Sequence, residues 1–83
     1  MYYFYVIRSE SGEYYSGYSS DLRRRFAEHN SGAQTATRGR QWSLVYYEAY
    51  VSERAARERE RTIKRNGRMR GLLMRRIRAQ QSD

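Results

Sequence analysis

The first part of the chain alternates between two sets of side chains with a period of two, which predicts a β-hairpin. Residues 2–8 are rich in aromatic and β-branched side chains, with Tyr5 expected on one face of a strand and Phe4 on the other. Residues 9–13 have the composition of a turn, and residues 14–18 are expected to form the returning strand. We therefore expect two antiparallel strands at the start of the fold.

After the hairpin, the spacing of apolar residues becomes that of a short helix. Leu22 and Phe26 lie about one turn apart, so we expect a helix from Asp21 to His29. A serine of the preceding Ser-Ser pair is its expected N-cap, and Gly32 is its expected C-terminal cap.

The second half of the chain predicts one more strand and two more helices. Residues 31–42 are polar without periodicity and indicate an exposed basic loop, and residues 43–51 indicate a third strand. Ser52 is the expected N-cap of a helix over 53–65, and a last helix over 69–79 carries one apolar stripe. This order of elements predicts an α+β fold, with a small three-stranded antiparallel sheet flanked by helices.

Length and composition limit this fold to one small domain. The chain has 83 residues, so we assign residues 1–79 to a single domain and 80–83 to a polar C-terminal tail. It has no cysteine, so neither a disulfide nor a thiolate metal site is expected. The N-terminal segment is short and aromatic, and no apolar run approaches the roughly 18 residues of a membrane span, so we expect a soluble cytoplasmic protein.

The charge balance indicates an anionic partner. Seventeen basic residues stand against nine acidic ones, which gives a net charge of +8. Such a charge on a compact domain is typical of proteins that bind nucleic acid, and the alternative is a solubilising charge in an arginine-rich proteome. A membrane surface fits less well, because no predicted helix combines a basic face with a broad apolar face.

Two polar residues of the first helix lie toward its apolar side. On a helical wheel Arg25 lies beside Leu22 and His29 close to it, whereas Arg23 and Arg24 point away. Arg25 either pairs with a carboxylate of this chain, or binds a phosphate from outside, or reaches solvent along the helix edge. His29 is either a helix-end residue that interacts with the helix dipole or part of a reactive site.

The second helix carries one carboxylate on its apolar stripe. Ala56, Glu60 and Ile63 are spaced so that they face the same way. Such a glutamate either forms a salt bridge with Arg25 or coordinates a hard cation. Two inward polar groups on separate helices, both directed at the sheet, indicate a shared site.

Tyrosines complete this set of candidate residues. The chain has nine, of which Tyr46, Tyr47 and Tyr50 are expected to pack within the sheet. Tyr5 and Tyr15 lie on the hairpin and are placed to project together toward the helices. A phenol, a guanidinium, an imidazole and a carboxylate on one face suit phosphodiester hydrolysis, in which a base takes a proton from water and cations offset the phosphate charge. Because free tyrosine has a pKa of about 10, this role requires a metal or arginines that favour the phenolate.

These residues lie in segments that resemble the GIY-YIG nuclease domain. The segments "FYV" (4–6) and "YSG" (15–17) are similar to the two half-motifs that name the family, and "SSDLRRRFAEHNSG", "TRGRQWSLVYYEAY" and "AARERERTIKR" follow in the same order. The resemblance covers about residues 2–77 and is closest to the small stand-alone bacterial members. It implies the same small sheet flanked by helices, and a metal-dependent endonuclease in which water attacks the phosphodiester.

The resemblance also implies roles for individual residues. Tyr5 and Tyr15 match the tyrosines of the two half-motifs, and either is, or assists, the general base. Arg25 matches the arginine that contacts the scissile phosphate, and His29 matches a histidine or tyrosine that lines the site. Glu60 matches the glutamate that holds the one divalent cation, Mg²⁺ or Mn²⁺.

Several positions depart from the family pattern. Phe4 replaces the first glycine, Val6 departs at the third position of the first half-motif, and Ser16 replaces isoleucine. Gly17 is retained and leaves room for a close approach at the strand end. Tyr18 stands where repair-type members often carry a lysine, which removes a positive charge that would activate a phenol.

We see no appended DNA-recognition domain of the kind that larger relatives carry, so we expect binding through phosphate contacts and selectivity for structure over sequence. The expected contacts outside the catalytic set are Arg23, Arg24, Arg38, Arg40, Trp42 and Lys64. Trp42 either stacks on a base or packs against the sheet. The leading interpretation is an endonuclease acting on DNA, or else RNA, in DNA repair or recombination, with a targeting protein or a second copy as further partners. The alternatives are a non-catalytic nucleic-acid-binding module, and a structural protein in which an Arg25–Glu60 pair stabilises the core.

Overall fold

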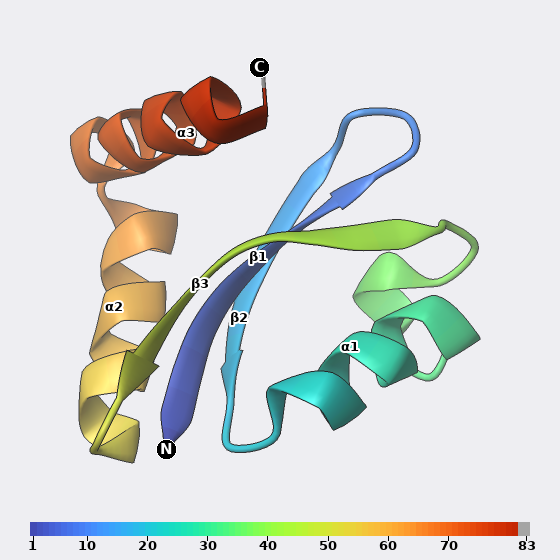
Figure 1. Ribbon diagram of the computed structural model, residues 1–83, viewed down its shortest axis with the longest axis horizontal. Coiled ribbons are helices and arrows are strands. Elements are labelled where there is room, and N and C mark those ends of the chain that lie inside the picture. The colour runs from blue at the N-terminus through green and yellow to red at the C-terminus, as the bar shows by residue number, and fades with distance from the viewer. Residues whose placement is uncertain (82–83) are drawn as a thin grey trace.

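In the computed structural model, which describes residues 1–81, one antiparallel sheet carries helices on both faces (Figure 1). The strands are β1 (Tyr2–Ser9), β2 (Tyr14–Ser19) and β3 (Trp42–Tyr50), in the spatial order β2-β1-β3. The helices are α1 (Leu22–Ser31), a 3-10 helix η1 (Thr35–Thr37), α2 (Glu53–Arg65) and α3 (Gly67–Gln81). The predicted α+β fold class and the predicted order of strands and α-helices are confirmed.

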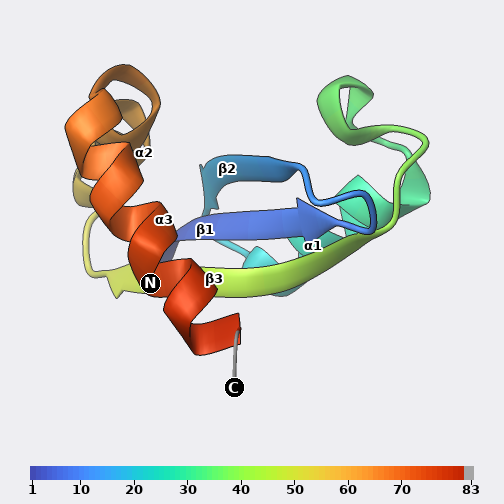
Figure 2. The ribbon, with the colours of Figure 1, turned by 90° about the horizontal axis from the view of Figure 1, so that it is seen from above.

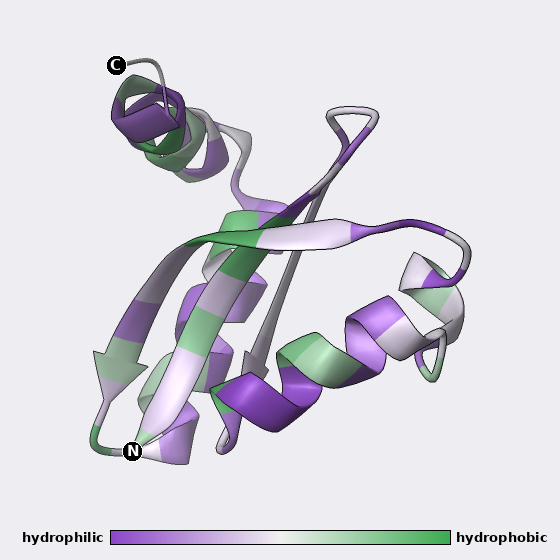
Figure 3. Cartoon of the chain, turned by 45° about the vertical axis from the view of Figure 1, so that its right-hand side comes forward, coloured by the Kyte–Doolittle hydropathy of each residue, from purple (hydrophilic) through white to green (hydrophobic). Residues whose placement is uncertain are grey.

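The central strand β1 alternates between two small cores. Phe4 and Val6 face α2 and α3, where they pack with Ile63, Leu73 and Ile77. Their neighbours along the strand face the other way and pack with residues of α1 and with the first residue of β3; this second cluster consists of Tyr5, Ile7, Trp42, Tyr15, Leu22 and Phe26. Seen from above, α2 and α3 lie on one side of the sheet and α1 on the other (Figure 2). The sheet therefore separates two layers of helices. Hydrophilic residues (purple) and hydrophobic residues (green) follow each other along the strands and helices, as an amphipathic pattern requires (Figure 3).

The tyrosines of β3 divide between these environments. Tyr46 and Tyr50 pack against the core that contains Phe4, as predicted. Tyr47 is 55% exposed, and its ring meets that of Tyr3 edge to face at 6.0 Å between centroids. Its packing is therefore a surface pair rather than core packing.

The first helix begins one residue later than predicted, and Asp21 is its N-cap. The Asp21 carboxylate accepts a hydrogen bond from the backbone N–H of Arg24 at 3.1 Å. Ser19 accepts a hydrogen bond from the Asp21 backbone N–H instead, so the expected serine cap supports the cap residue. Gly32 takes the left-handed conformation at φ 83°, which confirms the predicted C-terminal cap.

The junction between α2 and α3 is a single residue. Helix α2 has the predicted bounds and the predicted Ser52 cap. Asn66 ends it, and the Asn66 side-chain oxygen accepts the backbone N–H of Met69 at 3.0 Å, which caps the start of α3. Helix α3 begins two residues earlier than predicted and continues through Gln81, so it includes the first two residues of the predicted tail, whereas residues 82 and 83 lie outside the described part. Within residues 1–81, no helix is long and apolar enough to cross a membrane.

Candidate functional site

The two tyrosines of the half-motifs face the α1 side of the hairpin. Tyr5 pairs with Gly17 across the β1–β2 ladder, and Ile7 pairs with Tyr15. Tyr5 is 1% exposed, and a Cβ atom built on Gly17 would lie 2.6 Å from its hydroxyl oxygen. The phenol of Tyr5 therefore occupies the space that the missing side chain of Gly17 leaves, so glycine is needed here for close approach rather than for an unusual backbone conformation.

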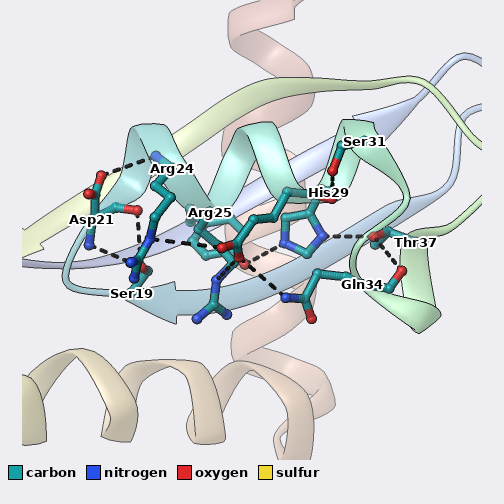
Figure 4. Close-up of polar contacts among 10 residues, drawn as sticks. Ser19, Asp21, Arg24, Arg25, His29, Ser31, Gln34 and Thr37 are labelled. Atoms are coloured by element: carbon teal, nitrogen blue, oxygen red, sulfur yellow. Dashed lines mark hydrogen bonds and ion pairs between the residues drawn. The ribbon is translucent and has the colours of Figure 1, made fainter.

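His29 of α1 connects Tyr5 to η1. Its Nε2 lies 2.7 Å from the Tyr5 hydroxyl and its Nδ1 lies 2.8 Å from the Thr37 hydroxyl (Figure 4). Because the Thr37 hydroxyl donates its proton to the Gln34 carbonyl, its oxygen is the acceptor for Nδ1–H. Nε2 is then the unprotonated nitrogen and accepts the proton of the Tyr5 hydroxyl. His29 lies in the last turn of α1, but both of its ring nitrogens are engaged in this buried chain, so neither caps the last carbonyls of the helix.

Burial sets the protonation states of the pair. It raises the pKa of Tyr5 to about 12, although the positive charge of Arg25 acts in the opposite direction. Burial, together with the charge of Arg25, lowers the pKa of His29 below its ordinary value. At neutral pH the resting site therefore holds a neutral phenol and a neutral imidazole, and Arg25 alone does not make Tyr5 a phenolate.

Arg25 is half-buried beside this pair and keeps an unsatisfied donor. Its Nε lies 3.2 Å from Glu28 Oε1, which is an ion-pair distance. The same Nε is buried and has no aligned hydrogen-bond acceptor among residues 1–81. A buried donor of this kind is unfavourable unless an acceptor reaches it from outside the chain. Of the three interpretations of Arg25, pairing with a carboxylate of this chain is the one observed, with Glu28 as the partner, and contact with a phosphate stays a prediction that would also satisfy the buried Nε.

Glu60 approaches the tyrosines from α2. Its Oε2 lies 2.7 Å from Lys64 Nζ, and the Lys64 ammonium lies 5.4 Å from the centre of the Tyr15 ring. Burial is the main cause of the raised pKa of Tyr5, and the negative charge of Glu60 adds to it. The carboxylate therefore acts electrostatically on the same phenol that His29 contacts.

The Arg25–Glu60 salt bridge weighed in the sequence analysis is not formed. Among the described residues, the ion pairs of these side chains are Arg25 with Glu28 and Glu60 with Lys64. Glu28 lies three residues after Arg25 on α1, and its carboxylate is turned toward the Arg25 guanidinium. The interpretation in which an Arg25–Glu60 pair merely stabilises the core is therefore wrong.

Glu60 is the candidate ligand for a hard cation. Within residues 1–81, no three histidine, aspartate or glutamate side chains cluster as a metal centre. Mg²⁺ is commonly held by only one or two carboxylates, with water and substrate phosphate completing its shell. The side chain of Glu60 is 19% exposed and is neutralised by the Lys64 ammonium, a positive charge that a divalent cation would replace. The residues present thus fit one such ion.

The predicted arginine contacts differ in how free they are. Arg23, Arg24 and Arg38 are exposed, and Arg38 donates a hydrogen bond to the Gly32 carbonyl. Arg40 is half-buried and forms an ion pair with Glu13 at 2.6 Å. Arg24 forms only a long ion pair with Glu28, at 3.9 Å, and stays 64% exposed, so Arg23 and Arg24 on the outer side of α1 are the side chains of this set best placed to meet a ligand.

Trp42 belongs to the core. It is 6% exposed, and its indole N–H donates a hydrogen bond to the Thr37 carbonyl at 2.9 Å. The side chain of Asn30 bonds both the backbone N–H and the carbonyl of Trp42, which fixes the start of β3 against α1. Of the two interpretations of Trp42, packing is confirmed, and its predicted contact with a base is wrong.

Thr37 is the site residue that sequence reasoning missed. It is 0% exposed and lies in η1, inside a segment that was expected to be an exposed loop. A Thr-Ala-Thr segment in polar surroundings has neither helical nor strand periodicity. Only its contact with His29, eight residues earlier in the chain, reveals its role.

Comparison with known proteins places this geometry in context. The family model of the GIY-YIG catalytic domain matches residues 1–72. A UPF0213 protein of Halobacterium salinarum is 44% identical over 66 residues, which span 77% of this chain and 86% of that protein. A UPF0213 protein of Streptococcus pneumoniae is 41% identical over 68 residues, with 80% and 69% covered, and one of Listeria innocua is 35% identical over 66 residues, with 76% and 72% covered. No solved structure matches the chain significantly.

Proposed function

Because this chain belongs to the GIY-YIG catalytic domain family, whose fold is that of a nuclease, we propose that it is a metal-dependent endonuclease that hydrolyses phosphodiester bonds of DNA. One observation carries the proposal. The buried chain from Thr37 through His29 to Tyr5 has its phenol and imidazole near Arg25, whose Nε pairs with Glu28 but makes no hydrogen bond among the described residues. A proton-accepting chain next to an unsatisfied cation is what attack of water on a phosphate diester requires.

Arg25 binds and orients the phosphate in this scheme. Its Nε donates a hydrogen bond to a non-bridging phosphate oxygen, which satisfies the buried donor. Because negative charge accumulates on these oxygens as water attacks, the guanidinium stabilises the transition state more than the ground state.

Tyr5 and His29 together act as the base. The attacking water gives a proton to the Tyr5 oxygen while Tyr5 passes its own proton to Nε2 of His29. The new bond from the water oxygen to phosphorus forms, and the bond to the leaving oxygen breaks. A phenolate never accumulates, so a pKa of about 12 for Tyr5 is no obstacle. The lowered pKa of His29 keeps its accepting nitrogen free at neutral pH, and Thr37 holds the ring through Nδ1.

Glu60 would hold the divalent cation, Mg²⁺ or Mn²⁺, and Lys64 keeps the carboxylate paired in its absence. When bound, such a cation supplies positive charge to the phosphate oxygens and the leaving group. Tyr15 contributes the ring over which Lys64 lies and the edge against which the His29 imidazole packs, at 5.2 Å between ring centroids. It therefore positions both groups, while Tyr5 carries the proton.

The substrate we propose is DNA recognised by its shape, as in repair or recombination intermediates. The net charge of +8 and the exposed Arg23 and Arg24, which precede Arg25 on α1, support contacts to phosphates on either side of the scissile bond. Phosphate contacts carry no direct sequence information, so cleavage should vary with DNA structure more than with base sequence.

Cleavage of supercoiled plasmid and of branched DNA tests the proposal, with Mg²⁺, with Mn²⁺ and with chelator. We expect cleavage that requires the metal and that falls about 10²- to 10³-fold in Glu60→Gln. Glu58→Gln is the matched control, since it removes the same charge from an exposed position of α2. Absence of cleavage by the wild type, while wild type and Glu60→Gln bind DNA equally, would instead support the non-catalytic binding module.

A further inference from the structure

The excess positive charge of the chain is concentrated on α3. This helix contains five arginines and no acidic residue, in a chain whose net charge is +8. Arg70 donates hydrogen bonds to the carbonyls of Ile63 and Lys64, and thereby caps the end of α2. The other four are exposed and form no ion pair or hydrogen bond with any residue of 1–81; they are Arg68, Arg75, Arg76 and Arg78.

Three of these arginines lie on the outward side of the helix. Leu73 and Ile77 are its buried residues, and they define the side that faces α2 and β3. On the helical wheel Arg68 and Arg75 lie opposite that side with Arg78 beside them, whereas Arg76 lies at its edge, where it lines a pocket with Tyr46 and Glu48. In Figures 1 and 2, α3 lies across the sheet from α1, so this surface is separate from the Tyr5–His29 site.

Two residues of this outward side are unfavourable for the helix itself. Gly71 lies within α3, where glycine is a poor helix former, and a Cβ atom built on it would meet nothing within 4 Å. The protein therefore gives no packing reason for glycine at this position. Arg68 lies in the first turn, where the positive end of the helix dipole disfavours a cation. Both choices are explained if an anionic surface approaches the helix backbone closely at this point.

We propose that the outward side of α3 binds the phosphate backbone of nucleic acid, as a second contact surface outside the catalytic site. Arg68 and Arg75 are seven residues apart, or about 10.5 Å along the helix axis. Duplex DNA carries about six phosphate charges over that length of its own axis. Gly71, between the two arginines, leaves space for the backbone of the helix to approach a phosphate.

Nucleic acid fits this surface better than a lipid membrane does. A membrane-surface helix pairs its basic face with a broad apolar face that inserts among the lipids. Leu73 and Ile77 of α3 are buried against the sheet and α2, and the large apolar side chains that this helix exposes are Leu72, at 50%, and Met69, at 37%. The inference rests on the proposed function for its partner, yet it assigns binding, not cleavage, to α3.

Binding to a 30-base-pair duplex in chelator, followed as a function of salt, tests the assignment. The triple variant Arg68→Gln, Arg75→Gln, Arg78→Gln should weaken binding at least tenfold and reduce the slope of log Kd against log salt by about 0.9 per lost contact. The control triple variant Arg8→Gln, Arg54→Gln, Arg61→Gln removes the same charge from scattered exposed positions and should reduce binding much less. An equal loss in both triple variants, or no loss in the first, would overturn the proposal.

Gly71 gives a second test that does not alter charge. Gly71→Gln places a neutral side chain where the protein itself has open space, so the thermal midpoint should stay equal or rise. DNA binding should nevertheless weaken severalfold, because the side chain blocks approach to the helix. Unchanged DNA binding in Gly71→Gln, or loss of binding to phosphatidylserine vesicles but not to DNA in the arginine variant, would refute the assignment. These binding results do not depend on the nuclease proposal. If the protein bound DNA through α3 but did not cleave it, only the nuclease proposal would be contradicted.

Discussion

Two polar clusters on opposite faces of the sheet use the same kinds of side chains to different ends. On the α1 side, the phenol of Tyr5 and the imidazole of His29 lie beside Arg25. On the α2 and α3 side, a carboxylate of β3, Glu48, is bound by an arginine of α2 and by two phenols. Phenol and guanidinium recur in both, and the difference lies in whether every donor has an acceptor.

The cluster around Glu48 is closed. Its carboxylate accepts hydrogen bonds from two nitrogens of Arg59, at 3.0 and 3.1 Å, and from the hydroxyls of Tyr46 and Tyr50. Although burial acts to raise it, these hydrogen bonds lower the pKa of Glu48. The guanidinium also lies over the ring of Phe4, at 5.8 Å from its centre. The polar groups of this cluster satisfy one another, so we assign to it a role in the stability of the fold.

The cluster around Arg25 is open. Tyr5, His29 and Thr37 satisfy one another, but Arg25 Nε makes no hydrogen bond among the described residues, although it lies 3.2 Å from Glu28 Oε1. The comparison teaches that residue types alone do not distinguish a stabilising network from a reactive one. The unsatisfied donor is the better guide, because such groups are rare in folded proteins and occur where water, an ion or a reacting group makes the contact.

Substitution of Arg25 should give the largest effect, and on activity alone. Arg25→Gln removes the charge that faces the phosphate, so the cleavage rate should fall about 10²- to 10³-fold. The thermal midpoint should stay close to that of the wild type, because the Arg25–Glu28 ion pair that is lost is one-third exposed and such pairs contribute little. Arg54→Gln, on the exposed side of α2, is the control. If Arg25→Gln were destabilised but cleaved normally per folded molecule, the cluster around Arg25 would serve stability and not catalysis.

Substitution of Glu48 should do the opposite. Glu48→Gln leaves Arg59 without a counter-charge, and the two side chains are only 19% and 23% exposed, so we expect a loss of about 2–3 kcal/mol in the free energy of unfolding. Urea unfolding measures this loss, and cleavage per folded molecule should stay unchanged. If cleavage collapsed while stability held, the closed cluster would have to be counted as part of the site.

Substitution of Thr37 should lower both the stability of the fold and the rate of cleavage. Thr37→Val leaves the Nδ1–H of His29 without an acceptor in a buried position, which should cost about 1–3 kcal/mol of stability. Cleavage should fall about tenfold as well, because the imidazole is no longer held with Nε2 free, whereas Thr37→Ser should restore both. Stability loss with full cleavage would show that Thr37 supports only the fold.

The dependence of stability on pH should differ between the two clusters, and this is the smallest of the expected effects. The pKa of His29 is lowered from 6.5, so its neutral form stabilises the fold fully above pH 6.5, and this contribution is lost as pH falls toward the folded pKa. Glu48, with a pKa lowered from 4.5, contributes stability above that pH and loses it at lower pH. As the pH is lowered, the unfolding midpoint of the wild type should therefore fall first below pH 6.5 and again below pH 4.5. His29→Gln should abolish the first decrease, and Glu48→Gln should abolish the second. The acidic limb of the cleavage rate should likewise lie below pH 6.5.

Periodicity and capping chemistry predicted the elements well, because these are local properties. The bounds of α2 and its Ser52 cap follow from a serine before a helical stripe, and Gly32 ends α1 as expected. Asp21 rather than a serine caps α1. Serine and aspartate are both good N-cap residues, so the sequence alone does not say which of two neighbours takes that position. Local patterns therefore fixed elements to within about two residues.

Pairing between elements was less predictable. A helical wheel gives the direction of Arg25 and Glu60 but not their partners, and Glu28 and Lys64, one turn away on the same helices, proved to be those partners. Thr37 could not be found at all, because its role depends on where η1 packs. The candidate residues themselves were found because polar groups on apolar stripes are conspicuous in sequence.

The alternation of β1 and β2 has a consequence for substitutions in the half-motif segments. Tyr5, Tyr15 and Gly17 lie on the α1 side of the hairpin, whereas Phe4, Val6 and Ser16 lie on the side of α2 and α3. A change at Phe4, Val6 or Ser16 therefore alters the core behind the sheet, and it reaches the chemistry only through the stability of the fold.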